Sequence, residues 1–188
     1  MTKSAKTRKA LLAAMGPYVL KYGLNTASLR PLAQAAGTSD RMLIYHFGSK
    51  DGLIAALIEH LAGELAMSLT TALPQEPATT VHDCAVEIVS LLRSEPYKAY
   101  MRVWLDIVSA AGQGNESHQR AGYLMIEGFL QWLQFRLPPD TPEPERAAKF
   151  VLTLVEGVMI MDSVGQTQTA DVAVDALADL SASGKETS

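Results

Sequence analysis

The side chains best suited to a chemical task gather between residues 28 and 50, on the second of two short predicted helices. Arg41 can form a bidentate pair of hydrogen bonds with a guanine edge, and Asp40 can accept from cytosine or orient Arg41. Hydroxyl and amine groups suited to phosphate contacts belong to Thr38, Ser39, Tyr45 and Lys50. Further candidates for contact with duplex DNA are Ser28, Arg30, Met42 and His46.

Two short helices joined by a tight turn would position these side chains. We predict the first over residues 29–36, with Ser28 as its cap and Pro31 in its opening turn. Gly37 supplies the sharp turn, and Ser39 caps a second helix that reaches residue 46. The apolar residues expected to face inward are Leu29, Leu32, Ala33, Ala36, Leu43 and Phe47. This spacing is typical of a helix-turn-helix unit, although an ordinary pair of short helices in a bundle fits it too.

The charge of the chain is split between its two parts. Residues 1–50 carry eight basic and one acidic side chain, a net charge of +7, whereas the remainder carries −11. A polyanion such as DNA is drawn to the first part and repelled by the rest. The charge therefore supports a nucleic-acid partner without naming it.

Composition excludes several other classes of protein. The 188 residues are 48% hydrophobic and include a single cysteine, which excludes an internal disulfide framework and a cysteine-built zinc site. No uninterrupted apolar run reaches the ~18 residues needed to span a membrane. We therefore expect a soluble, cytoplasmic protein with no membrane partner.

Helical periodicity continues along nearly the whole chain, and strand signals are nearly absent. We predict an all-α fold whose first helix covers residues 7–22, and we expect a frayed tail over 181–188. The longer helices after the short pair are predicted over residues 49–73, 81–93, 96–111, 116–137, 142–165 and 170–180.

The N-terminal part resembles the TetR family of bacterial transcriptional regulators. The residues that carry the resemblance are Thr7-Arg8, Leu11-Leu12-Ala13-Ala14, Tyr22-Gly23, Ser28-Leu29, Leu32-Ala33, Ala36-Gly37-x-Ser39, Leu43, His46-Phe47 and Gly48-Ser49-Lys50-x-x-Leu53. The resemblance implies a three-helix DNA-binding domain over residues 1–52 and a larger helical domain over 53–188 that binds an effector and dimerises. Most members of the family repress transcription and leave their operator when a small molecule binds.

One position departs from the family pattern within the second short helix. The family usually has a Leu-Tyr pair where this chain has Leu43-Ile44, so the tyrosine that contacts phosphate is displaced to Tyr45. Adjacent helical residues are separated by about 100° of rotation, which leaves open whether Tyr45 reaches the same phosphate.

The two segments over 116–137 and 142–165 are apolar around most of their circumference. Such helices must be covered on all sides, and a second copy of the chain supplies that cover most simply. A deeply buried pair within a monomer is the alternative. Candidate dimer-interface residues are Leu124, Phe135, Val151, Val155 and Val158.

Methionine and aromatic side chains on several helices suit an apolar cavity for a small effector. Candidate pocket residues are Tyr97, Met101, Trp104, Met125, Phe129 and Met159, although core packing explains such residues as well. Acidic residues that could orient a cationic or hydroxylated ligand, if they are buried, are Glu87, Asp106, Glu127 and Glu156.

The sequence offers no pattern that favours catalysis. It has no Gly-rich phosphate loop, no His-Glu-x-x-His motif and no paired Glu-x-x-His motif. We therefore expect no enzyme activity, no cofactor and no metal site. A helical enzyme with an unrecognised site and a protein–protein adaptor remain the alternatives to a DNA-binding regulator.

Overall fold

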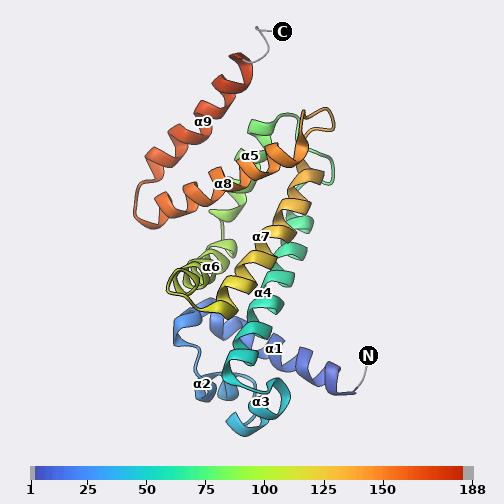
Figure 1. Cartoon of the computed structure of the whole chain (residues 1–188), viewed down its shortest axis with the longest axis vertical. Coiled ribbons are helices and arrows are strands. Elements are labelled where there is room, and N and C mark those ends of the chain that lie inside the picture. Colours follow the sequence, from blue (N-terminus) through green and yellow to red (C-terminus); the bar gives the residue numbers. More distant parts are fainter. Residues whose placement is uncertain (1–2, 184–188) are drawn as a thin grey trace. The chain divides into compact units, whose positions relative to one another are not determined.

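The computed structural model describes the backbone of residues 3–183 and the side chains of residues 7–178. Within this range the chain forms helices and no strand, which confirms the predicted all-α fold (Figure 1). A 3₁₀ helix, η1, covers Leu24–Thr26. The α-helices are α1 (Lys3–Tyr22), α2 (Leu29–Ala35), α3 (Asp40–Phe47), α4 (Lys50–Ala72), α5 (Val81–Leu92), α6 (Tyr97–Gly112), α7 (Glu116–Arg136), α8 (Pro144–Ser163) and α9 (Thr167–Ser183).

The predicted helix boundaries agree with the structure to within a few residues, except at the start of α1. The agreement is close because local residues set these ends: Ser39 caps α3, and Pro74 follows the end of α4. The 3₁₀ helix η1 was not predicted. Helix α9 extends into the tail that we expect to be frayed, and residues 184–188 lie outside the described residues.

Contacts between residues divide the chain into two compact units. Unit 1 comprises Met1–Leu69 and Pro96–Met125, and unit 2 comprises Thr70–Glu95 and Ile126–Ser188. This division does not coincide with the functional boundary that we predict after residue 52, because the first part of α4 and helix α6 pack into the same core as α1–α3.

The core of unit 1 joins the N-terminal helices to α4 and α6. Met15 of α1, Leu43 of α3 and Leu57 of α4 are fully buried, and Ile107 of α6 is 1% exposed. Burying such a side chain contributes about 1.5–3 kcal/mol. Helix α3 is therefore held by a core that extends well beyond the two short helices.

The core of unit 2 is formed where α5, α8 and α9 pack on one another. Ile88 of α5 and Val151 of α8 are fully buried, while Val155 of α8 and Ala170 of α9 are 1% exposed. The apolar residues that wrap α8 are thus covered in large part by helices of the same chain.

A buried arginine closes the end of unit 2 where α7 finishes. The guanidinium of Arg136, which is 6% exposed, donates to the carbonyls of Pro74 and Glu76 and to the Glu87 carboxylate, the last at 2.7 Å. In return, the N–H of Ala78 donates to the carbonyl of Arg136 at 2.9 Å. The loop between α4 and α5 is thereby tied to both α7 and α5.

Helix α4 is long and apolar enough to cross a membrane by length and composition, which differs from our expectation from uninterrupted apolar runs. Core helices pass the same test. Here Leu53, Leu57 and Leu61 of α4 are 2% exposed or less and belong to the core of unit 1. Packing in the core of unit 1 accounts for the apolar residues on this face of α4.

Candidate nucleic-acid interface

The turn between α2 and α3 is closed by backbone hydrogen bonds. The N–H of Thr38 donates to the carbonyl of Ala33 at 2.9 Å, and Gly37 has a φ of 62°. Glycine adopts this left-handed conformation without a steric penalty. The hydroxyl of Ser39 accepts from the N–H of Met42 at 3.3 Å and caps α3 as predicted. Turn and cap together determine where α3 begins.

Ser28 stands at the N-cap position of α2, but its hydroxyl makes no capping hydrogen bond. The predicted side-chain cap is therefore wrong at this position. The N–H of Leu32 instead donates to the main-chain carbonyl of Ser28 at 3.3 Å. The exposed Ser28 side chain is left at the surface of the unit.

The inward face of the two short helices is apolar, as predicted. Leu32 and Leu43 are fully buried, and Ala33 and Phe47 are 3% and 7% exposed. The guanidinium of Arg8 lies over the ring of Phe47, 5.0 Å from its centroid, so α1 contacts the end of α3 through a cation–π interaction. These contacts fix which side of α3 faces away from the core.

The opposite face of α3 is open to solvent. None of the ten predicted DNA-binding residues is buried: Thr38 and His46 are half-buried, and the other eight are exposed. The eight exposed residues are Ser28, Arg30, Ser39, Asp40, Arg41, Met42, Tyr45 and Lys50. The structure thus leaves hydrogen-bonding and charged groups accessible along α2, α3 and the start of α4.

Tyr45 is the most exposed large hydrophobic side chain of α3. It is 77% exposed, whereas the neighbouring Ile44 is half-buried. The Tyr45 ring meets the ring of His46 edge-on, with the centroids 5.2 Å apart. At the displaced position the tyrosine therefore points into solvent and is accessible to a ligand.

The start of α4 completes this surface. The hydroxyl of Ser49 accepts from the N–H of Gly52 at 3.0 Å, and Lys50 is the exposed first residue of the helix. A Cβ on residue 52 would collide with the carbonyl oxygen of Phe47, so only glycine allows this approach. Sequence reasoning missed Gly52, although a glycine in the first turn of a long apolar helix is a usable signal. The N-terminus of such a helix attracts anions such as phosphate.

Four predicted effector-pocket residues belong to unit 1. Tyr97 is 5% exposed, and its hydroxyl lies 2.8 Å from the hydroxyl of Ser68. Trp104 and Met125 pack against the core of the unit, and Met101 is half-buried. All four are therefore at least partly inside the unit, where core packing accounts for them as well as a ligand would.

The other two predicted pocket residues belong to unit 2. Phe129 is half-buried and packs against Trp132, with ring centroids 5.1 Å apart, and Met159 is 7% exposed. Because the six residues are divided between the units, the effector pocket stays a prediction.

Glu87 and Asp106, which are among the carboxylates that could orient a ligand, accept hydrogen bonds from groups of the chain itself. Glu87 accepts a hydrogen bond from Arg136 at 2.7 Å. Asp106 accepts from the N–H of Leu24 at 2.7 Å and from the side-chain amide of Asn25 at 2.6 Å. These two carboxylates are satisfied by the protein itself, so they give no support to a cationic effector.

The predicted dimer-interface residues fall into two groups. Leu124 and Phe135 of α7 are 61% and 80% exposed. Val151, Val155 and Val158 of α8 are buried within unit 2, at most 2% exposed. Burial in the chain's own core leaves Val151 and Val155 no surface for a partner chain.

An apolar groove runs along α8 and α9. It has a volume of about 380 Å³, and Val158 is the one predicted interface residue that lines it. Its lining residues are Phe150, Thr153, Leu154, Gly157, Val158, Met161, Thr169, Ala170 and Ala173. Sequence reasoning paired α7 with α8 and left two roles open for the segment over residues 170–180, completion of the dimer interface or cover of the pocket. Here α9 lines the groove through Thr169, Ala170 and Ala173.

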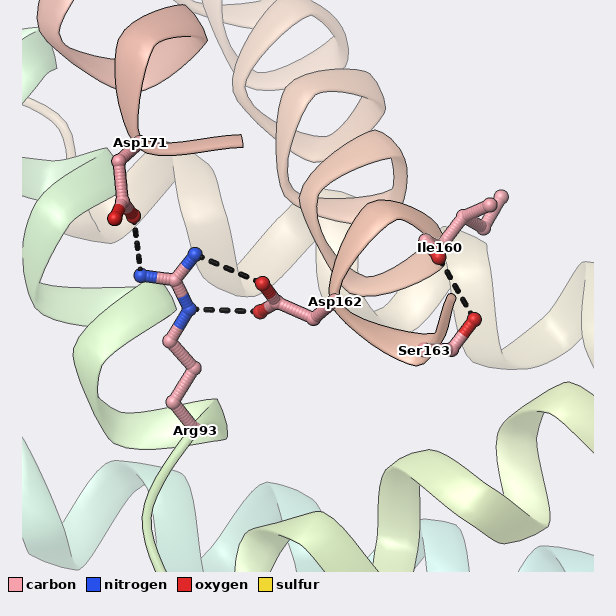
Figure 2. Close-up of polar contacts among 5 residues, drawn as sticks. All are labelled: Arg93, Ile160, Asp162, Ser163 and Asp171. Atoms are coloured by element: carbon pink, nitrogen blue, oxygen red, sulfur yellow. Dashed lines mark hydrogen bonds and ion pairs between the residues drawn. The ribbon is translucent and has the colours of Figure 1, made fainter. Parts of the chain in front are cut away.

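An ion-pair network holds the helices that form this groove (Figure 2). The guanidinium of Arg93, just after α5, donates to both carboxylate oxygens of Asp162 at 2.7 and 3.1 Å. It also donates to Asp171 on α9 at 2.7 Å. The two carboxylates raise the pKa of Arg93 above its usual value, chiefly through the hydrogen bond to Asp162. One side chain thus links α5, the end of α8 and the first turns of α9.

Among the residues whose side chains are described, no group of three His, Cys, Asp or Glu could hold a metal ion. The single cysteine, Cys84, is fully buried, and burial raises the pKa of its thiol to about 11. The thiol is therefore protonated near neutral pH and is a poor nucleophile.

Comparison with known proteins gives a family match for the segment that contains α3. A model of the family described as "Bacterial regulatory proteins, tetR family" matches residues 20–57, which include η1, α2, α3 and the start of α4. The chain is 30% identical over 146 residues to the HTH-type transcriptional regulatory protein RaaS of Mycobacterium tuberculosis. This alignment covers 78% of the chain but 62% of RaaS, less than two thirds of that relative.

Solved structures show the same fold over nearly the whole chain. A TetR-family transcriptional regulator from Cytophaga hutchinsonii superimposes with a TM-score of 0.72 and 19% identity, over 97% of this chain and 96% of that one. The multidrug binding protein EbrR, solved in complex with proflavin, gives a TM-score of 0.72 with 17% identity, over 93% of this chain and 99% of that one.

Proposed function

The chain belongs to the TetR family of bacterial transcriptional regulators, and from this premise we propose that it binds a palindromic operator as a homodimer. We propose further that it represses transcription until a small, largely apolar effector releases it from DNA. Members of this family are regulators and not enzymes, so a helical enzyme is no longer an alternative. A protein that acts on chromosomal DNA works in the cytoplasm, where we place this one.

The observation that carries the proposal is the exposed polar face of α3. Helices of helix-turn-helix units enter the major groove and read base edges with residues near their N-terminus. Asp40 and Arg41 are the first two residues of α3, and both are exposed. In the proposed complex Arg41 reads a guanine, while Asp40 accepts from a cytosine or orients Arg41.

The other exposed groups of this surface are suited to fixing the register on DNA. Phosphate contacts position a protein without reading sequence, and hydroxyl, amine and guanidinium groups make them. We propose that Met42 touches a thymine methyl group and that the half-buried His46 also contacts the DNA. The groups proposed to contact phosphates are those of Ser28, Arg30, Thr38, Ser39, Tyr45 and Lys50.

We propose that a second copy of the chain covers the α8–α9 groove. Phe150 and Met161 line the groove and are 49% and 37% exposed, a large apolar area for side chains on one helix. A two-fold axis through this face would bring the same residues of both copies together, as an isologous interface requires. Such a dimer presents two α3 helices to a palindromic site.

The effector proposal rests on adaptable apolar side chains. Within unit 1, Met101, Trp104 and Met125 are of types that line pockets for varied apolar ligands. The solved complex of EbrR with proflavin supports a small-molecule site in a protein of this fold. Release from DNA requires that the effector binds one conformational state more tightly than the other.

Replacing Arg41 by alanine tests the proposed reading contact. The variant should bind the cognate operator about 1–3 kcal/mol more weakly and lose preference at one base pair of each half-site. Fluorescence anisotropy with single-base operator variants measures both effects. The control Arg41→Lys keeps the charge but loses the bidentate geometry, so it should also lose the preference. An equal loss on every sequence would make Arg41 a phosphate contact instead.

Replacing Lys50 by alanine tests the phosphate contact at the start of α4. Affinity should fall by a similar factor on specific and random duplexes, because a phosphate contact carries no sequence information. The slope of log affinity against log salt should decrease by about one per binding site. Lys98→Ala, at an exposed lysine of α6, is the control and should leave the slope unchanged. If the salt slope of Lys50→Ala equals that of the wild type, Lys50 does not contact a DNA phosphate.

A further inference from the structure

A carboxylate on α6 is bound to the junction between α1 and α2, some eighty residues earlier in the chain. Asp106 accepts from the N–H of Leu24 at 2.7 Å and from the N–H of Asn25 at 3.4 Å. It also accepts from the side-chain amide of Asn25 at 2.6 Å. All these residues belong to unit 1. One side chain thus receives three donors from the 3₁₀ helix η1.

The junction is shaped to receive this carboxylate. Gly23 precedes η1 with a φ of 85°, a conformation that side chains other than glycine rarely adopt. A Cβ at that position would lie 3.0 Å from the nearer carboxylate oxygen of Asp106. The first N–H groups of a helix have no acceptor within the helix, and here Asp106 supplies one. The absence of a side chain at Gly23 therefore leaves room for the Asp106 carboxylate beside η1.

A second polar contact lies beside the first. The guanidinium of Arg102 donates to the carbonyl of Leu20 in α1 at 3.3 Å. Arg102 and Asp106 are four residues apart and so share one face of α6. The adjacent Val103 and Ile107 are buried in the core of unit 1, at 4% and 1% exposure. Helix α6 therefore contacts the end of α1 and η1 through both apolar and polar groups.

The contact between Asp106 and η1 matters because η1 lies next to α2 in the chain. Only Ala27 and Ser28 separate η1 from α2, and α2 leads through the Gly37 turn into α3. A shift of η1 relative to α6 would therefore be passed on to α2 over only two residues. We propose that Asp106 is a positioning residue that fixes the direction of the two reading helices and so limits which half-site spacings the protein accepts.

This inference rests on the proposed function, because spacing has meaning only for a dimer on a two-part operator. A role in stability alone would act differently. It would lower the fraction of folded protein and weaken binding to operators of every spacing by the same factor. Spacing selectivity, the ratio of affinities for the best spacing and for operators one base pair longer or shorter, separates the two roles.

The test compares full-length wild type with Asp106→Ala on duplexes whose two half-sites are separated by graded spacers. Losing hydrogen bonds worth about 1 kcal/mol should reduce spacing selectivity about fivefold, while the salt slope stays unchanged. Asp140→Ala, at an exposed carboxylate in a loop of unit 2, is the matched control and should keep the wild-type ratio. A ratio equal to that of the wild type, with affinity and Tm falling together, overturns the proposal.

Asn25→Ala removes one donor of the same contact, the side-chain amide that binds Asp106. Asn25 is exposed, so this variant serves as the test if Asp106→Ala folds poorly. It should reduce spacing selectivity in the same direction, and the double variant should lose less than the sum of both effects. Additive effects, or a wild-type ratio in Asn25→Ala, contradict a shared positioning role. If the wild type itself prefers no two-part operator, the proposed function fails, which is a different outcome from failure of the Asp106 contact.

Discussion

Replacing Phe150 by glutamate is expected to dissociate the homodimer and to weaken binding to a palindromic operator by about 10²- to 10⁴-fold. Phe150 lines the apolar groove of α8 and α9, and a two-fold interface would bring it close to its symmetry mate. Two carboxylates in such an apolar contact are desolvated without partners. Sedimentation equilibrium measures the assembly, and anisotropy on operators with one or two half-sites measures the binding.

The substitution should leave the fold intact because Phe150 is 49% exposed. Val86→Glu is the matched control, since Val86 is 40% exposed on α5 in the same unit and lies outside the groove. The control should remain dimeric. A Phe150→Glu protein that sediments as a dimer and binds the two-part operator with wild-type affinity would move the interface to another face.

Replacing Arg136 by alanine is expected to cost about 3 kcal/mol of the free energy of unfolding, the lower end for breaking a buried ion pair. Arg136 is 6% exposed, and its guanidinium donates hydrogen bonds to the Glu87 carboxylate and to two loop carbonyls. The lower end applies because the Glu87 side chain is 34% exposed and regains some hydration. Urea unfolding followed by circular dichroism gives the value.

Arg146→Ala provides the comparison for this prediction. Arg146 is 83% exposed and pairs with Glu143 at 3.5 Å on the surface, where ion pairs contribute little. Its loss should leave the free energy of unfolding nearly unchanged. If Arg136→Ala were as stable as Arg146→Ala, the loop between α4 and α5 would not depend on the buried arginine.

Features determined by neighbouring residues could be predicted from the sequence. Gly37, Ser39 and Ser49 act within one helical turn, so the boundaries of α3 and α4 follow from their types. The burial of Leu43 and the exposure of Arg41 follow from the same helix period. The candidate DNA surface was accessible to sequence reasoning for this reason.

Features that depend on distant residues were missed. Asp106 meets Leu24 across 82 positions, and Arg93 meets Asp162 across 69, and neither pair leaves a local pattern in the sequence. Val151 and Val155 have the types of an interface residue, but α5 and α9 cover their helix within unit 2. Only the packed structure distinguishes a side chain covered by its own chain from one left for a partner.

Selection of genomic fragments by the purified protein at physiological salt, followed by sequencing, tests the central claim most directly. Our account predicts enrichment of a palindrome whose half-sites are about one helical turn of DNA apart. Arg41→Ala protein in a parallel selection should lose that enrichment at one base pair of each half-site. Failure of the wild type to enrich any sequence over bulk DNA, with and without prior removal of bound small molecules, would contradict operator binding through α3.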